Sequence, residues 1–99
     1  MIYVFDIDGT ICSQESPENY QNAKPIWPMI KRINQLYNAG HIIYFYTSRH
    51  MLKERLTKEW LKKHKVKYHH IFFGKPAGDL YIDDRSMKPD EFLNKSQTK

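Results

Sequence analysis

IYVFDIDGT, residues 2–10, combines a short apolar run with two carboxylates one residue apart and a glycine. An apolar run of this length is typical of a strand that is buried in a parallel sheet. Such strands end at the carboxyl edge of the sheet, where open α/β folds bind their ligands. Because Asp6 and Asp8 are two residues apart, their side chains can point to the same side of the extended chain. The segment therefore indicates a strand that ends in a functional site.

The two aspartates require an explanation, since close like charges repel and raise a pKa unless a cation lies between them. The pair indicates either a shared proton or a hard metal ion such as Mg2+. Gly9 allows a sharp turn and a close approach of the backbone to a ligand. The alternative is a pair of strand-end carboxylates that only cap the next loop. Residues further along the chain discriminate between these interpretations.

Length and composition predict one globular domain. The chain has 99 residues, of which 40% are hydrophobic and 14% aromatic, which fits a single core. We expect no membrane span, because no apolar run approaches the roughly 20 residues that a span needs. We also expect no signal peptide, since the start of the chain has no basic region or cleavage site. Cys12 is the only cysteine, which excludes an internal disulfide, and a cytoplasmic location is expected.

The net charge of +5 results from 16 basic and 11 acidic residues, and much of the excess lies in 53–67. A basic face could attract nucleic acid or phosphorylated substrates. The same segment contains Glu–Lys pairs four residues apart, such as Glu54 with Lys58, which are typical of a solvated helix face. The solvated face is the favoured interpretation, and nucleic-acid binding is the second.

Hydrophobic periodicity predicts an alternation of strands and helices after the first strand, and hence a parallel sheet of about four strands. The polar segment 11–24 is expected to be a flap over the site. The expected elements are helix 28–38, strand 41–46, a helix from 52 to about 64, strand 68–73, strand 80–82 and helix 88–94. Trp27 and Trp60 are expected in the core, and the adjacent His69 and His70 give no zinc-ligand spacing.

Polar residues follow each predicted strand. Thr47 ends the second strand, Lys75 lies in the loop beyond the third, and Asp83 and Asp84 end the fourth. A parallel sheet would bring them to one edge, together with the first aspartate pair. Without a metal, repulsion would cost roughly 1 kcal/mol or more per close pair at an effective dielectric of about 20. A bound divalent cation would remove this cost.

The order Asp-x-Asp-Gly-Thr, Thr, Lys, Asp-Asp resembles the four motifs of the haloacid dehalogenase-like (HAD) superfamily, most of whose members are Mg2+-dependent phosphatases. The resemblance covers nearly the whole chain. Segments 22–26, 74–76 and 80–85 are similar to small bacterial proteins without a cap domain that are described as capsule-biosynthesis phosphatases. The Ile82-Asp83-Asp84-Arg85 ending is also similar to the phosphatase domain of phage polynucleotide kinase.

The resemblance implies a fold and a domain organisation. The fold is a three-layer α/β/α sandwich with a small parallel, Rossmann-like sheet of the HAD type. Residues 1–99 form a single hydrolase domain without a cap domain, and the flap 11–24 is all that covers the site. The open site implies either a large substrate or a partner subunit, including a second copy of the chain, that completes it.

The resemblance also implies catalytic roles. Asp6 is the nucleophile that forms an aspartyl-phosphate, and Asp8 is the general acid and base. Thr47 binds a phosphoryl oxygen, and Lys75 offsets negative charge. Phosphate or substrate contacts are further expected from Gly9, Thr10, Ser48, Arg49 and Arg85. The two arginines could instead brace the acidic loops.

The implied cofactor is Mg2+, held by Asp6, the backbone carbonyl of Asp8 and Asp84, with Asp83 further from the ion. The alternative, in which Asp83 is the direct ligand, stays open.

The expected reaction is hydrolysis of a phosphate monoester. In the resembled superfamily, dehalogenases lack an acid/base at the position of Asp8, and phosphomutases usually carry a cap for which this chain has no room. A sugar phosphate or a similar small phosphorylated metabolite is the expected substrate. The alternatives are a phosphatase that acts on 3′ or 5′ polynucleotide ends and a catalytically silent phosphate-binding or interaction module.

Overall fold

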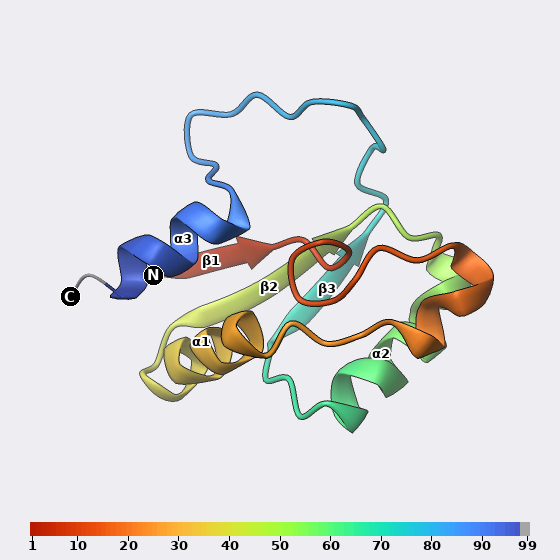
Figure 1. Ribbon diagram of the computed structural model, residues 1–99, viewed down its shortest axis with the longest axis horizontal. Helices are drawn as coiled ribbons and strands as arrows, with labels where there is room; N and C mark the ends of the chain where they lie inside the picture. Colours follow the sequence, from red (N-terminus) through yellow and green to blue (C-terminus); the bar gives the residue numbers. More distant parts are fainter. Residues whose placement is uncertain (98–99) are drawn as a thin grey trace.

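The computed structural model describes residues 1–97 and is a small α/β structure around a parallel sheet (Figure 1). The three strands lie in the order β1-β2-β3, with Val4 opposite Tyr44 and Phe45 opposite Ile71. The elements in chain order are β1 (Ile2–Phe5), the 3-10 helix η1 (Pro17–Asn22), α1 (Trp27–Asn38), β2 (Ile42–Thr47), the 3-10 helix η2 (Met51–Lys53), α2 (Glu54–Lys63), β3 (His70–Phe73) and α3 (Pro89–Gln97).

Helix α1 forms where the apolar spacing predicts it. Its buried residues are Met29, Ile30, Ile33 and Leu36. The helix ends in a turn in which His41 N–H donates to the Leu36 carbonyl (3.1 Å) and Gly40 N–H to the Tyr37 carbonyl (3.1 Å). Gly40 adopts a φ of +96°, which costs a glycine little because it has no Cβ. Gly40 therefore allows the chain to turn sharply from α1 into β2.

The core lies on one face of the sheet. Alternate strand residues on this face, including Phe5, Ile43, Phe45 and Ile71, are buried together with side chains from α1 and α2. Helix α3 packs on the same face, since the Phe92 ring contacts Tyr3 and Phe5. The opposite face exposes large apolar residues, namely Ile2, Val4, Ile42, Tyr46 and Phe72. Residues 1–97 thus form two layers, and the expected third layer is absent from this part of the chain.

The expected fourth strand is also absent from the sheet in the described residues. Residues 74–88 form a long loop that arches away from the strands (Figure 1), in which the side chains of Leu80 and Ile82 are 76% and 90% exposed. The apolar run has only three residues before Asp83. The Tyr81 hydroxyl also closes the loop on itself, because it donates to the Pro76 carbonyl and accepts from Gly78 N–H. β1 is therefore an edge strand.

The flap 11–24 has more structure than a plain loop. It contains η1, and hydrogen bonds close its base, from Ser13 N–H to the Lys24 carbonyl (2.9 Å) and from Ile26 N–H to the Ile11 carbonyl (2.8 Å). The indole N–H of Trp60 donates to the Ala23 carbonyl (2.9 Å), which fixes the end of the flap to α2.

The two tryptophans have different environments. Trp60 is buried as expected, whereas Trp27 is 55% exposed, so its predicted place in the core is wrong. Trp27 occupies the first position of α1, where the buried face of the helix has not yet begun. Within residues 1–97, no helix combines the length and the apolar character that crossing a membrane requires.

Candidate active site

Three of the predicted site residues meet at the carboxyl edge of the sheet. Asp6 directly follows β1, Thr47 ends β2, and Lys75 lies two residues beyond β3. The backbone N–H of Lys75 donates to the Thr47 carbonyl (3.0 Å), and its ammonium lies 3.5 Å from Oδ2 of Asp6. The ends of the three strands thus place Asp6, Thr47 and Lys75 at one edge of the sheet, and the roles expected of them stay predictions.

The Asp6 carboxylate is oriented but accessible. Its Oδ1 accepts a hydrogen bond from the N–H of Ile7 (2.8 Å), while Oδ2 faces Lys75, and the side chain remains 36% exposed. Lys75 is held from the other side by the ring of Tyr81, whose centroid lies 4.3 Å from Nζ. The lysine thus places a cation next to an accessible carboxylate oxygen.

Asp8 is paired with Arg49, which is itself 3% exposed. Nε of Arg49 donates to Oδ2 of Asp8 (3.0 Å) and Nη2 donates to Oδ1 (2.8 Å), a bidentate arrangement. Nη1 donates to the hydroxyl of Thr57 on α2 (3.0 Å), and the guanidinium carbon lies 3.8 Å from the ring centroid of Tyr20. Of the two roles considered for Arg49, the structure shows the one that braces an acidic loop.

Cys12 lies beside this pair and is fully buried. Its thiol approaches Oδ1 of Asp8 (3.9 Å). Burial, and then the negative charge of Asp8, raise the pKa of Cys12 to about 12 against a partly opposing effect of Arg49. Burial is also the main cause that raises the pKa of Tyr20, with Asp8 second. Both groups therefore remain protonated at neutral pH.

The turn after Asp8 requires a glycine. Gly9 has a φ of +80°, and a Cβ at this position would lie 3.0 Å from Nε2 of Gln14. The N–H groups of Thr10 and Ile11 both donate to the Ile7 carbonyl, at 3.1 and 3.0 Å. Thr10 is buried in this turn.

Thr47 and Ser48 differ in accessibility. Thr47 is fully buried, and its hydroxyl accepts a hydrogen bond from Arg49 N–H (3.1 Å), so it stabilises the turn after β2. Ser48 is exposed at the same edge. In this conformation Ser48, not the Thr47 hydroxyl, is the accessible one of the two.

Asp83, Asp84 and Arg85 are not brought to the other site residues. All three are exposed in the loop 74–88. Arg85 N–H donates to Oδ1 of Asp83 (2.9 Å), and this bond is the main cause that lowers the pKa of Asp83. Across residues 1–97, the structure forms no group of three or more His, Cys, Asp or Glu side chains that could hold a metal ion. The conformation described therefore does not fit the predicted Mg2+ site.

Sequence reasoning missed the residues that surround Arg49. Tyr20 comes from the flap and Thr57 from α2, and neither belongs to a recognisable motif.

The comparisons with known proteins give a close structural relative. A crystal structure of a Vibrio cholerae protein, solved as an MCSG target, matches with a TM-score of 0.81 and 30% sequence identity, over 93% of this chain and 86% of that one. The chain belongs to the same family as this Vibrio cholerae protein. No protein-family model matches the sequence, and no curated protein does either.

Two further solved structures share the fold. Both are chains from structures of the Pnkp1/Rnl/Hen1 complex, and one of these structures is described as that of an RNA repair complex. Their TM-scores are 0.66 and 0.65 at 20% and 16% identity, and the matches cover 93% and 96% of this chain. This chain spans 33% and 29% of those two proteins.

Proposed function

We propose that this protein is a Mg2+-dependent phosphate monoester hydrolase of the HAD type that acts through an aspartyl-phosphate on Asp6. The observation that carries the proposal is the meeting of Asp6 and Lys75 at the carboxyl edge of a parallel sheet, beside the end of β2. Phosphoryl transfer needs an in-line oxygen nucleophile and positive charge at the phosphoryl oxygens. Asp6 supplies the oxygen and Lys75 the positive charge, with Nζ of Lys75 3.5 Å from Oδ2 of Asp6.

On this proposal, the reaction has two displacements at phosphorus. A carboxylate oxygen of Asp6 bonds to phosphorus while the ester P–O bond breaks, and the leaving oxygen takes a proton from Asp8. Water then attacks the phosphorus of the aspartyl-phosphate and gives its proton to Asp8, which releases inorganic phosphate and restores Asp6.

Arg49 constrains the first of these steps. Both carboxylate oxygens of Asp8 accept a hydrogen bond from Arg49, so the pair occupies the group that would carry the proton. To donate a proton to the leaving oxygen, Asp8 must leave this pair. We therefore assign Arg49 the role of positioning Asp8 rather than of binding substrate.

Magnesium belongs to the proposal as the ion that would offset negative charge on the phosphoryl group. Holding it would require Asp83 and Asp84 to approach Asp6. Two features support such a movement, namely the exposed apolar side chains of Leu80 and Ile82 and the free edge of β1 in the described part of the chain. Docking of 80–82 beside β1 would bury these side chains and supply the missing strand.

The proposed substrate is a sugar phosphate or another small phosphorylated metabolite, as in the resembled phosphatases. A phosphorylated nucleic-acid end is the second candidate. It is favoured by the net charge of +5 and by the RNA repair complex among the structures of similar fold.

Phosphate release from a substrate panel tests the proposal. The panel contains sugar phosphates, nucleotides and 3′- or 5′-phosphorylated oligonucleotides, each with Mg2+ and with EDTA. Release that depends on Mg2+ supports the hydrolase, and the preferred member separates the two substrate classes. Phosphate binding without release from any member would instead favour a catalytically silent binding module.

A further inference from the structure

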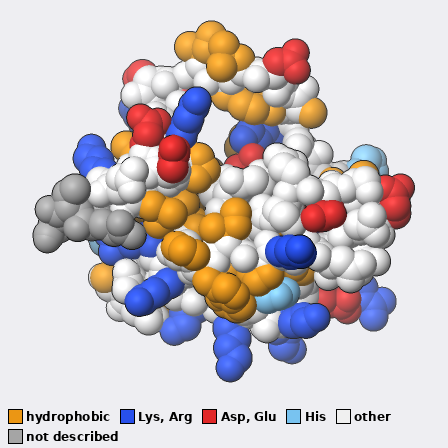
Figure 2. Space-filling model, in the orientation of Figure 1, with side chains coloured by type: hydrophobic (Ala, Val, Ile, Leu, Met, Phe, Trp, Pro, Cys, Tyr) orange, Lys and Arg blue, Asp and Glu red, His pale blue; other side chains and the backbone are white. Residues whose placement is uncertain are grey.

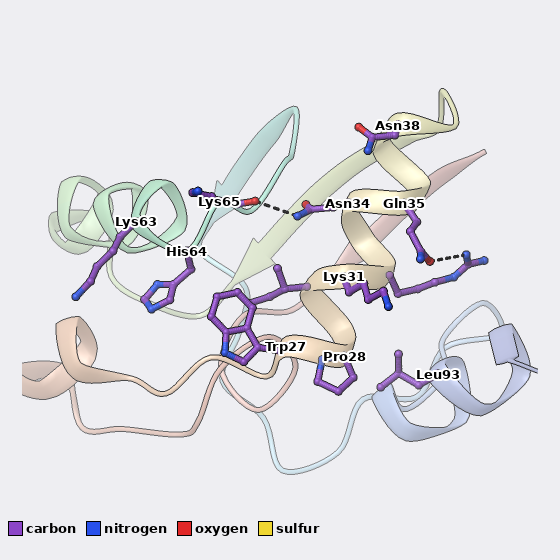
Figure 3. A pocket seen from close by; sticks show the side chains of 12 residues that line it. Trp27, Pro28, Lys31, Asn34, Gln35, Asn38, Lys63, His64, Lys65 and Leu93 are labelled. Atoms are coloured by element: carbon purple, nitrogen blue, oxygen red, sulfur yellow. Dashed lines mark hydrogen bonds between the residues drawn. The ribbon is translucent and has the colours of Figure 1, made fainter.

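A groove of about 1090 Å³ runs along α1, on the helix-covered side of the molecule. Figure 3 shows Trp27 near its centre, the end of α2 on one side and Leu93 of α3 on the other. From Trp27 to Asn38, both of which line the groove, α1 is about 16 Å long, given the rise of an α-helix. The groove is thus longer than a single nucleotide.

The groove is lined by positive charge. Four of its residues are cations, namely Lys31, Arg32, Lys63 and Lys65, and none of its lining residues within the described chain is Asp or Glu. Over residues 1–97, no ion pair involves Lys31, Lys63 or Lys65. Figure 2 shows several Lys and Arg side chains around an apolar patch and a histidine in the lower part of this face. A polyanion would complement this surface.

Trp27 provides the groove with an accessible aromatic ring that neighbouring rings hold in place. Its indole, 55% exposed, contacts the ring of His64 at a centroid distance of 5.8 Å. His64 is held in turn by the ring of Trp60 (4.1 Å) and through Nδ1 by the Trp60 carbonyl (2.9 Å). An accessible ring beside cations is the arrangement on which nucleic-acid bases stack.

Lys65 occupies a position where the backbone favours glycine. Its φ is +58°, the one positive φ of a non-glycine residue in the described chain. Asn34 of α1 stabilises this turn, since its amide donates to the Lys65 carbonyl (3.0 Å) and its Oδ1 accepts from Lys67 N–H (2.8 Å). This turn places Lys65 at the end of α2, where it lines the groove.

We propose that this groove binds a single-stranded segment of nucleic acid, with a base stacked on Trp27 and phosphates near Lys31, Lys63 and Lys65. The inference goes beyond the proposed hydrolase and does not depend on it. The probe therefore carries no terminal phosphate, so that it is not a substrate of the candidate active site.

The test is fluorescence anisotropy of a labelled oligothymidylate of about twelve nucleotides with hydroxyl ends, at about 50 mM and about 200 mM salt. We expect saturable binding that Trp27→Ala weakens about tenfold and that Trp27→Phe largely retains. Lys65→Gly is expected to weaken binding several-fold and to reduce the slope of log affinity against log salt by about 0.7.

Lys65→Gly also distinguishes a loss of binding from a loss of folding stability. Glycine relieves the positive φ, so the melting temperature is expected to stay level or rise while affinity falls. The matched control is Arg55→Ala, which removes one exposed positive charge from the outer surface of α2, outside the groove. This variant is expected to bind like the wild type.

Three results would overturn the proposal. The first is the absence of saturable binding at the lower salt concentration. The second is an equal loss in Arg55→Ala and Lys65→Gly, which would mean that net charge alone attracts the strand. The third is inorganic polyphosphate binding as tightly as the oligonucleotide with no effect of Trp27→Ala, since that ligand has no base to stack.

Discussion

Arg49 and Asp8 form an ion pair with two hydrogen bonds, 3.0 Å from Nε to Oδ2 and 2.8 Å from Nη2 to Oδ1. The pair links the turn after β1 to the turn after β2. Because Arg49 is buried and also contacts Thr57 and Tyr20, one side chain connects the candidate site to α2 and to the flap.

Replacing Arg49 should destabilise the protein by leaving a poorly hydrated Asp8 without its partner. We expect Arg49→Met to lower the free energy of unfolding in urea by about 3 kcal/mol. The double variant with Asp8→Asn should regain part of this loss, because no charge is left unpaired. Strict additivity of the two substitutions would contradict the pairing.

The pKa of Cys12 gives a prediction for high pH. The folded-state pKa of about 12 lies above the ordinary value of 9.0, so the unfolded chain loses the thiol proton first. The difference in the free energy of unfolding between wild type and Cys12→Ala should be constant below pH 9.0. As the pH rises toward 12, the wild type should lose stability relative to Cys12→Ala. Urea titrations of both proteins at several pH values measure it. A difference that is flat across this range would contradict the raised pKa.

Lys75 should contribute to turnover through its charge next to Asp6. We expect Lys75→Met to lower kcat by about 100-fold, the scale for removing one group that stabilises charge in a transition state. Lys88→Met removes an exposed lysine outside the site and is the control. If both variants kept wild-type turnover on the best substrate of the panel, Lys75 would have no catalytic role.

The segment 80–85 should change its environment when Mg2+ is added. On the proposed docking beside β1, the backbone N–H groups of this segment and of β1 gain partners, so their hydrogen exchange should slow. Asp84→Asn should reduce the effect, whereas Asp79→Asn, an exposed acid of the same loop, should not. Exchange that is identical with Mg2+ and with EDTA would contradict the docking.

Much of the fold could be predicted from the sequence because local patterns determine it. The apolar spacing between Met29 and Leu36 identifies α1, and the β-branched and aromatic run 42–46 identifies β2. Parallel strands then bring Asp6, Thr47 and Lys75 to one edge. The position of the run 80–82 could not be predicted in this way. Its place in a sheet depends on pairing with β1, which is distant in the chain. The hydrogen bonds of Tyr81 within the loop compete with that pairing.

The role of Arg49 illustrates a second limit. Its position two residues after Thr47 predicts that it lies near the site, but the sequence leaves open whether it contacts substrate or Asp8. The outcome depends on Tyr20 and Thr57, which come from the flap and α2. In the same way, the exposure of Trp27 depends on where the buried face of α1 begins, which composition does not reveal.

The most direct test of the proposed function is phosphate release by wild type and by Asp6→Asn on the best substrate of the panel, with Mg2+ present. Asp90→Asn, an exposed aspartate in the first turn of α3, is the matched control. We predict that Asp6→Asn abolishes release while its fold is kept, and that Asp90→Asn releases phosphate like the wild type. Wild-type release by Asp6→Asn would contradict the assignment of Asp6 as the nucleophile.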